Sequence, residues 1–82
     1  MNNLLVEAEL DLHGEFKGSA EMLTKEFLND SISLKRKKVS IIHGRSGGVL
    51  KNTVHEILKK DKRVKSYKVD FFNTGCTIVE FK

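Results

Sequence analysis

The stretch Val39-Ser40-Ile41-Ile42-His43-Gly44-Arg45-Ser46-Gly47-Gly48-Val49-Leu50 lies at the centre of the chain and decides its fold. It opens with a short segment of mostly β-branched residues, which predicts a strand over residues 39–42. A loop with three glycines in six residues, 43–48, ends the strand. Apolar side chains then follow at helical spacing, namely Leu50, Val54, Ile57 and Leu58. The stretch therefore predicts a strand, a glycine-rich loop and a helix in direct succession.

The residues on the N-terminal side follow the same order of strand and helix. Polar and apolar side chains alternate over residues 7–12, which predicts a half-buried strand that ends at His13-Gly14. A helix is predicted next, because small or apolar side chains recur at steps of three and four: Ala20, Leu23, Phe27, Ser31 and Leu34. On the C-terminal side, residues 64–72 and 76–81 are predicted to be two strands joined by the turn Asn73-Thr74-Gly75.

The element order β-α-β-α-β-β constrains the architecture. Right-handed crossovers that place both helices on one face make the first three strands parallel, and the fourth then returns antiparallel. We expect one domain over residues 1–82, its core about residues 7–82, with a two-layer α/β fold and a four-stranded mixed sheet. The loops after Leu12, after Ile42 and around Asn73 are then expected at one edge, where α/β proteins usually place their sites.

The chain is basic, with 15 Lys and Arg against 11 Asp and Glu among 82 residues and a net charge of +4. That balance favours polyanionic partners such as DNA, RNA or an anionic membrane surface, and it is equally compatible with a basic protein that has none. The single cysteine, Cys76, excludes an internal disulfide and is expected to be packed, and no Cys/His cluster has zinc spacing. No segment resembles a signal peptide or a membrane span, so we expect a cytoplasmic location without a membrane partner.

The glycine-rich loop is the strongest chemical signal in the residues themselves. Glycine lets backbone N–H groups approach a ligand, and the following helix offers unsatisfied N–H groups and a positive dipole end. Together with the cations Arg45 and Lys51, this loop predicts a phosphate site, although neither a Walker loop nor a GxGxxG motif is present. The alternative is a tight turn whose glycines serve packing. The residues assigned to nucleic-acid binding are Gly44, Arg45, Ser46, Gly47, Gly48, Lys51 and Asn73.

Asp11 and His13 form a second candidate site. They lie two apart at the end of the first strand, so both are expected on its polar face, where a carboxylate beside an imidazole suits acid–base chemistry. The alternative is a capping aspartate and a surface histidine. His43 follows the second strand in the equivalent place, so His13 and His43 are expected to flank one groove.

Other residues with chemical potential receive structural assignments. His55 is predicted to be a solvated residue of the second helix. The basic run Lys35-Arg36-Lys37-Lys38 can track a phosphate backbone, but it is expected at the edge opposite the glycine-rich loop. Tyr67 and Phe71 are expected in the core, whereas Phe72 is the better candidate for base stacking.

Two separated motifs resemble those of a known family. Leu10-Asp11-Leu12-His13-Gly14, followed by Ile41-Ile42-His43-Gly44 with Gly48 and Leu50, resembles the Smr (small MutS-related) domain, and the closing Asn73-x-Gly75-x-Thr77-Ile78-Val79 is similar to its last hairpin. The resemblance implies a fold like the C-terminal domain of bacterial translation initiation factor three, whose last strand lies antiparallel between the second and third. It also implies nucleic-acid binding, and several members of the family are endonucleases that nick DNA or cleave RNA.

The resemblance carries over residue by residue. Asp11 and His13 match the DxH element of the family, and residues 43–48 match its HGxGxG loop, with the middle glycine one place later at Gly47. The predicted function is therefore endonucleolytic cleavage of phosphodiester bonds in DNA or RNA.

The catalytic residues assigned on this basis are Asp11, His13 and His43. Asp11 would orient His13 as general base, while His43 and Arg45 stabilise the phosphate. Two mechanisms stay open: attack by an RNA 2′-hydroxyl without a metal, or attack by water on a Mg²⁺ ion that Asp11 helps to hold. The alternative functions are a non-catalytic module that binds DNA, RNA or the ribosome, and a purely structural domain.

Overall fold

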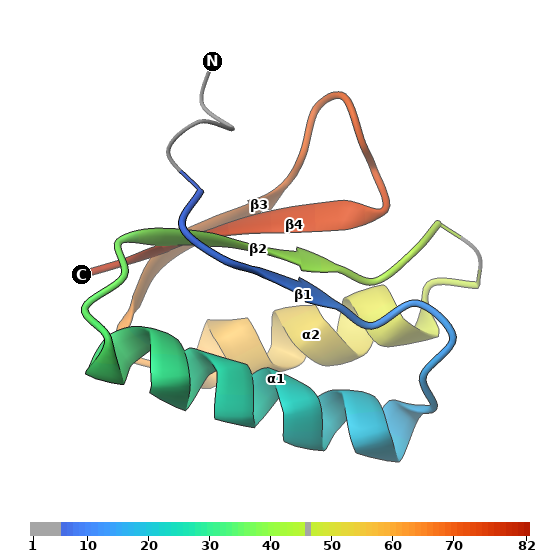
Figure 1. Cartoon of the computed structure of the whole chain (residues 1–82). Helices are drawn as coiled ribbons and strands as arrows, with labels where there is room; N and C mark the ends of the chain where they lie inside the picture. Colours follow the sequence, from blue (N-terminus) through green and yellow to red (C-terminus); the bar gives the residue numbers. More distant parts are fainter. Residues whose placement is uncertain (1–5, 46) are drawn as a thin grey trace.

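The computed structural model describes residues 6–45 and 47–82, so the assignment of Ser46 lies outside the described residues. Within these ranges six elements follow one another in the predicted order (Figure 1). They are β1 (Glu9–Asp11), α1 (Lys17–Ser33), β2 (Lys38–Ile42), α2 (Val49–Lys60), β3 (Val64–Val69) and β4 (Cys76–Phe81).

The strands form one mixed sheet in the order β1-β2-β4-β3. β1 pairs with β2 in parallel, with Asp11 opposite Ile42, and β4 runs antiparallel to both of its neighbours. β3 is therefore parallel to β2, and the last strand lies between the second and the third. Both helices cover the same face of the sheet (Figure 1). The predicted two-layer topology is confirmed.

The hydrophobic core fills the space between the sheet and the two helices. Alternation along β2 turns Val39 and Ile41 toward the helices, while the Ser40 hydroxyl on the other face donates to Glu9 (3.3 Å). The apolar side chains that are at most 1% exposed are Leu12, Ala20, Leu28, Val39, Ile41, Val54, Leu58 and Val79. One face of the sheet is thus packed, and the other is free of helices.

Two apolar residues lie outside the core in which the periodicity places them. Leu34 was expected on the buried stripe of the first helix, but α1 ends one residue earlier and Leu34 caps it in solvent. Phe71 was expected in the core, but β3 ends at Val69 and the chain leaves the sheet, so Phe71 is 86% exposed. Both predictions were wrong for the same reason, because the predicted element continues past its true end.

Candidate nucleic-acid interface

The loops that follow β1, β2 and β3 meet at one edge of the sheet, as predicted (Figure 1). The backbone N–H groups of His43 and Gly44 both donate to the carbonyl oxygen of Gly75 (2.8 and 3.0 Å). A Cβ atom at Gly75 would stand 3.1 Å from the Gly44 carbonyl carbon, which is a tight contact, so the close approach favours glycine. On the other side, a Cβ atom at Gly44 would lie 4.0 Å from the Cβ atom of His13. The loop after β1 and the glycine-rich loop are therefore direct neighbours.

The glycine-rich loop turns sharply into α2. Gly44, Gly47 and Gly48 have φ angles of 86°, 80° and 80°, a left-handed conformation that side-chain-bearing residues rarely adopt. Gly48 is the N-cap of α2, and among the described residues no side chain caps this helix end. The free N–H groups and positive dipole end lie beside the exposed Arg45 and the first-turn Lys51. These features make the edge suited to an anion.

Asp11 and His13 form a hydrogen-bonded pair at this edge. The Asp11 Oδ1 atom accepts from the backbone N–H of His13 (3.0 Å) and lies 3.3 Å from its Nδ1 atom. A carboxylate only accepts, so the His13 tautomer that this contact favours carries its proton on Nδ1. The Nε2 atom is then an unprotonated base on a side chain that is 77% exposed. Because the pair is exposed, it contributes little to the stability of the fold.

His43 does not flank a groove with His13, and that prediction was wrong. Its side chain is only 3% exposed. Its Nδ1–H donates to the Gly44 carbonyl oxygen (3.0 Å), and its Nε2 atom lies 2.8 Å from Thr77 Oγ1. The physical reason is strand alternation, since His43 continues the buried face of Ile41, whereas Asp11 lies on the helix-free face. The structure brings the two strand ends together but separates the two imidazoles.

His55 projects from α2 toward His43 and is not the solvated residue that the sequence suggested. Its Nε2 atom lies 2.8 Å from Thr77 Oγ1, the same hydroxyl that contacts His43. Its ring packs edge-on against His43 and Tyr67, with centroids 6.0 and 5.1 Å apart. A signal was present, because His55 lies three residues before Leu58 and so flanks the buried stripe of the helix.

The proton arrangement of this buried cluster follows from what each group can do. The Gly44 carbonyl only accepts, so the neutral His43 ring carries its proton on Nδ1 and accepts at Nε2. The Thr77 hydroxyl therefore donates to His43 and accepts from His55 Nε2–H. Every contact is satisfied with both histidines neutral, and the chain of bonds ties α2 to β4 and to the glycine-rich loop.

Acidification is expected to destabilise the fold through these two histidines. Burial lowers the pKa of His43 and of His55 below the ordinary value of 6.5, and the charge of Lys51 lowers both further. Below about pH 6.5 the unfolded imidazoles bind protons that the folded ones do not, so the free energy of unfolding falls. Urea unfolding at about pH 7.5 and about pH 5.5 measures this change. Equal or greater stability at the lower pH would contradict the neutral cluster.

Asn73, Cys76 and the basic run from Lys35 complete the residues that the sequence singled out. Asn73 is exposed, and its Oδ1 atom accepts from the Gly75 N–H (3.0 Å), so this side chain holds the turn before β4. Cys76 is packed, as predicted, and burial raises the pKa of its thiol. The basic run from Lys35 lies between α1 and β2, at the edge opposite the glycine-rich loop (Figure 1).

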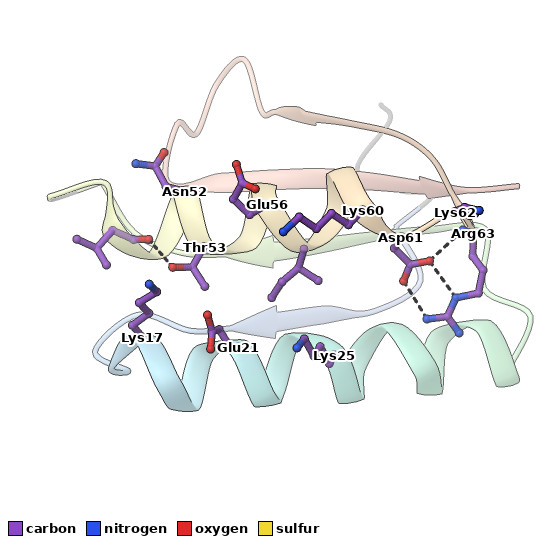
Figure 2. Close-up of a pocket in the computed structure, with 12 residues that line it drawn as sticks. Lys17, Glu21, Lys25, Asn52, Thr53, Glu56, Lys60, Asp61, Lys62 and Arg63 are labelled. Carbon is purple, nitrogen blue, oxygen red and sulfur yellow. Dashed lines mark hydrogen bonds and ion pairs between the residues drawn. The ribbon is translucent and has the colours of Figure 1, made fainter.

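A separate groove of about 990 Å³ runs between α1 and α2 (Figure 2). Cations and carboxylates alternate along it, and Asp61 pairs with Arg63 (2.9 Å), a hydrogen bond that lowers the pKa of the carboxyl. None of the described residues assigned to catalysis or nucleic-acid binding lines this groove. The mixed charge of this groove favours no single class of ligand.

In the part of the chain that the structure describes, no group of three or more His, Cys, Asp or Glu side chains is placed to hold a metal ion. None of the helices in that part combines the length and the apolar character that crossing a membrane requires.

The motif around Asp11 and His13 and the motif of residues 43–48 meet at one edge of the sheet. Residues 10–82 match the family model described as the Smr domain. The chain belongs to the Smr family. This Smr domain is 34% identical over 80 residues to Endonuclease MutS2 of Clostridium tetani, which covers 94% of the chain and 10% of that protein. It is 40% identical over 80 residues to Endonuclease MutS2 of Geobacillus kaustophilus, with the same coverage. The chain spans about a tenth of the length of these relatives.

Solved structures agree with this assignment. The crystal structure of the Smr domain of Thermus thermophilus MutS2 superposes with a TM-score of 0.87 at 27% identity, covering 92% of this chain and 98% of that one. YdaL, a stand-alone small MutS-related protein from Escherichia coli, has a TM-score of 0.87 at 17% identity, covering 90% and 63%. The second likeness concerns the fold alone. The Smr resemblance drawn from the motifs is confirmed.

Proposed function

We propose that this Smr domain binds nucleic acid at the edge where the three loops meet and cleaves phosphodiester bonds there. The observation that carries the proposal is the Asp11–His13 pair, which lies beside the glycine-rich loop and keeps a ring nitrogen of His13 free for a substrate proton. The relatives named Endonuclease MutS2 support the activity. Cleavage of labelled RNA and DNA, with Mg²⁺ and with a chelator, tests it.

The phosphate would be held by backbone and by cations. The N–H groups at the start of α2 donate to phosphate oxygens, and the positive helix end adds attraction. Arg45 supplies a fork of donors that matches a phosphate, and Lys51 supplies a point charge. The glycines have no side chain that would keep a phosphate away from the backbone.

The chemistry centres on His13. Its Nε2 atom takes the proton of the attacking oxygen, which is a 2′-hydroxyl in RNA or water in DNA, and that oxygen forms the new bond to phosphorus. The leaving oxygen departs with the electron pair of the broken P–O bond and is protonated by solvent. Asp11 keeps the Nδ1 proton in place and stabilises the imidazolium that forms. No step runs through a metal ion.

His43 takes a supporting part in this proposal. Its buried ring does not reach a bound phosphate, but it holds the Gly44 carbonyl and so sets the direction in which the glycine-rich loop leaves β2. Arg45 follows directly in that loop. In this proposal Arg45 contacts the phosphate directly and His43 does not. His43 instead orients the loop that carries Arg45.

The charge on the sheet limits how a nucleic acid can approach. Alternation and register place more carboxylates than lysines on the helix-free face: Glu7, Glu9, Asp11, Asp70 and Glu80 against Lys38 and Lys68. The excess of cations in this chain of net charge +4 therefore lies on the helices and loops. A phosphate backbone is repelled by the open sheet and attracted to the loop edge.

A binding module without catalysis is the second candidate function. It is favoured by the burial of His43, which leaves His13 without a partner imidazole to protonate the leaving oxygen. In that case the same edge would hold DNA, RNA or the ribosome for an associated activity.

The salt dependence of binding is expected to identify the phosphate contacts. Arg45→Ala should lower the slope of log affinity against log salt concentration by about 1, because one phosphate contact is lost. Fluorescence anisotropy with a labelled oligonucleotide at several salt concentrations measures the slope. Lys37→Ala, which removes a cation at the opposite edge, is the matched control and should leave the slope unchanged. Equal effects of the two variants would show that the charge acts only through the net total.

A further inference from the structure

Two phenylalanines stand in solvent at the tip of the loop between β3 and β4. Phe71 and Phe72 are 86% and 87% exposed, and their rings pack edge to face with centroids 5.0 Å apart. The loop that presents them is tied down, since the Asp70 N–H donates to the Cys76 carbonyl (2.9 Å) and the Cys76 N–H to the Asn73 carbonyl (3.0 Å). Large aromatic surface held in water at a fixed place usually marks a binding site.

A hollow of about 520 Å³ lies beside this loop on the helix-free face of the sheet, with Phe72 in its wall. Its polar lining is mainly acceptors: the carboxylates of Glu9 and Asp70 and the hydroxyl of Ser40. Phosphate is repelled there, whereas a group that donates hydrogen bonds is favoured. The size lies within the usual range for small-ligand sites.

The hollow lies close to the edge that is proposed to hold phosphate, because Phe72 and Asn73 line it and the same loop continues to Gly75. Gly75, whose carbonyl oxygen receives the N–H groups of His43 and Gly44, lies three residues after Phe72. Three residues of chain span at most about 11 Å. A ligand that has its phosphate on the glycine-rich loop can therefore place an adjoining group against Phe72.

We propose that Phe71, Phe72 and this hollow hold an unpaired, amino-bearing nucleobase of the bound strand. The inference rests on the proposed nucleic-acid binding and names its substrate class as single-stranded. The base stacks on the Phe72 ring, and its exocyclic amino group donates to Asp70 or Glu9. The faces of a base within a duplex are stacked on its neighbours, so such a base cannot stack on the Phe72 ring.

Anisotropy titrations with four probes test the site: twelve-nucleotide oligo-C and oligo-U, each as a single strand and as a duplex. Wild type should bind oligo-C more tightly than oligo-U, because cytosine has an amino donor where uracil has a carbonyl, and should bind both better than the duplexes. Phe72→Ala should weaken single-strand binding about tenfold without changing the salt slope or the duplex affinity. Asp70→Asn should reduce the ratio of oligo-C to oligo-U affinity.

Leu34→Ala is the matched control, since it removes another exposed apolar side chain, located at the C-terminal end of α1. It should leave all affinities unchanged. Single-strand affinity that survives Phe72→Ala, or a preference for duplex, overturns the base site while leaving the proposed binding intact. A lowered melting temperature of Phe72→Ala overturns it too, because the ring would then pack against the chain itself. Absence of binding to any probe overturns both the base site and the proposed function.

Discussion

His13→Ala is expected to reduce phosphodiester cleavage by about 10²–10⁴-fold, the range in which a positioned general base contributes, while nucleic-acid affinity stays close to that of wild type. The imidazole is 77% exposed and its hydrogen-bonding contact is with Asp11, so its removal leaves the core and the glycine-rich loop in place. Initial rates at saturating substrate, together with anisotropy binding curves, separate the two effects.

Asp11→Asn gives a second test of the same pair. The asparagine oxygen still accepts from the His13 backbone N–H, so the turn is kept, but the negative charge that stabilises the imidazolium is lost. Cleavage should therefore fall. Glu15→Gln, two residues after His13, is the matched carboxylate control and should leave the cleavage rate unchanged. Full activity in both His13→Ala and Asp11→Asn would place the chemistry elsewhere.

Thr77→Val is expected to lower the free energy of unfolding by about 2–4 kcal/mol, because one hydroxyl serves two histidines and each would lose its partner. Valine has the same shape, so no cavity forms and the loss reports the hydrogen bonds alone. Urea denaturation monitored by circular dichroism measures it.

Thr24→Val is the control with the same chemical change at the same burial. Thr77 and Thr24 are both 0% exposed, but Thr24 Oγ1 has no hydrogen-bond partner among the described residues. Replacing an unsatisfied hydroxyl with a methyl group should leave stability unchanged or raise it by about 1–2 kcal/mol. Equal losses in the two variants would mean that the histidine cluster contributes nothing through Thr77.

Hydrophobic periodicity predicts most of the fold because the core is built from regular faces. The alternation over residues 7–12 and the helical spacing from Leu50 to Leu58 each correspond to a buried surface. The right-handedness of strand-helix-strand crossovers then predicts which strands are parallel. The place of β4 between β2 and β3 has no such signal, since antiparallel pairing with either neighbour satisfies the same pattern, and it followed only from the family resemblance.

The candidate site was predicted less completely, for two physical reasons. Side-chain polarity does not reveal a partner distant in sequence, so the bond from His55 to Thr77, 22 residues away, was missed. The burial of His43 could have been inferred, because it continues the alternation of the buried Val39 and Ile41. The prediction that His43 is exposed followed from its place in a loop and did not take this alternation into account.

The proposed cleavage and the proposed base site both require the bound strand to lie along the loop edge. Titrating a short, non-cleavable single-stranded oligonucleotide into ¹⁵N-labelled protein at low salt maps the position of the strand by changes in amide chemical shift. We expect the largest changes at His13, Gly44, Gly47 and Gly48, and none at Arg36 or Lys37 at the opposite edge of the sheet. Changes concentrated at the basic run or in the groove between α1 and α2 would contradict this position.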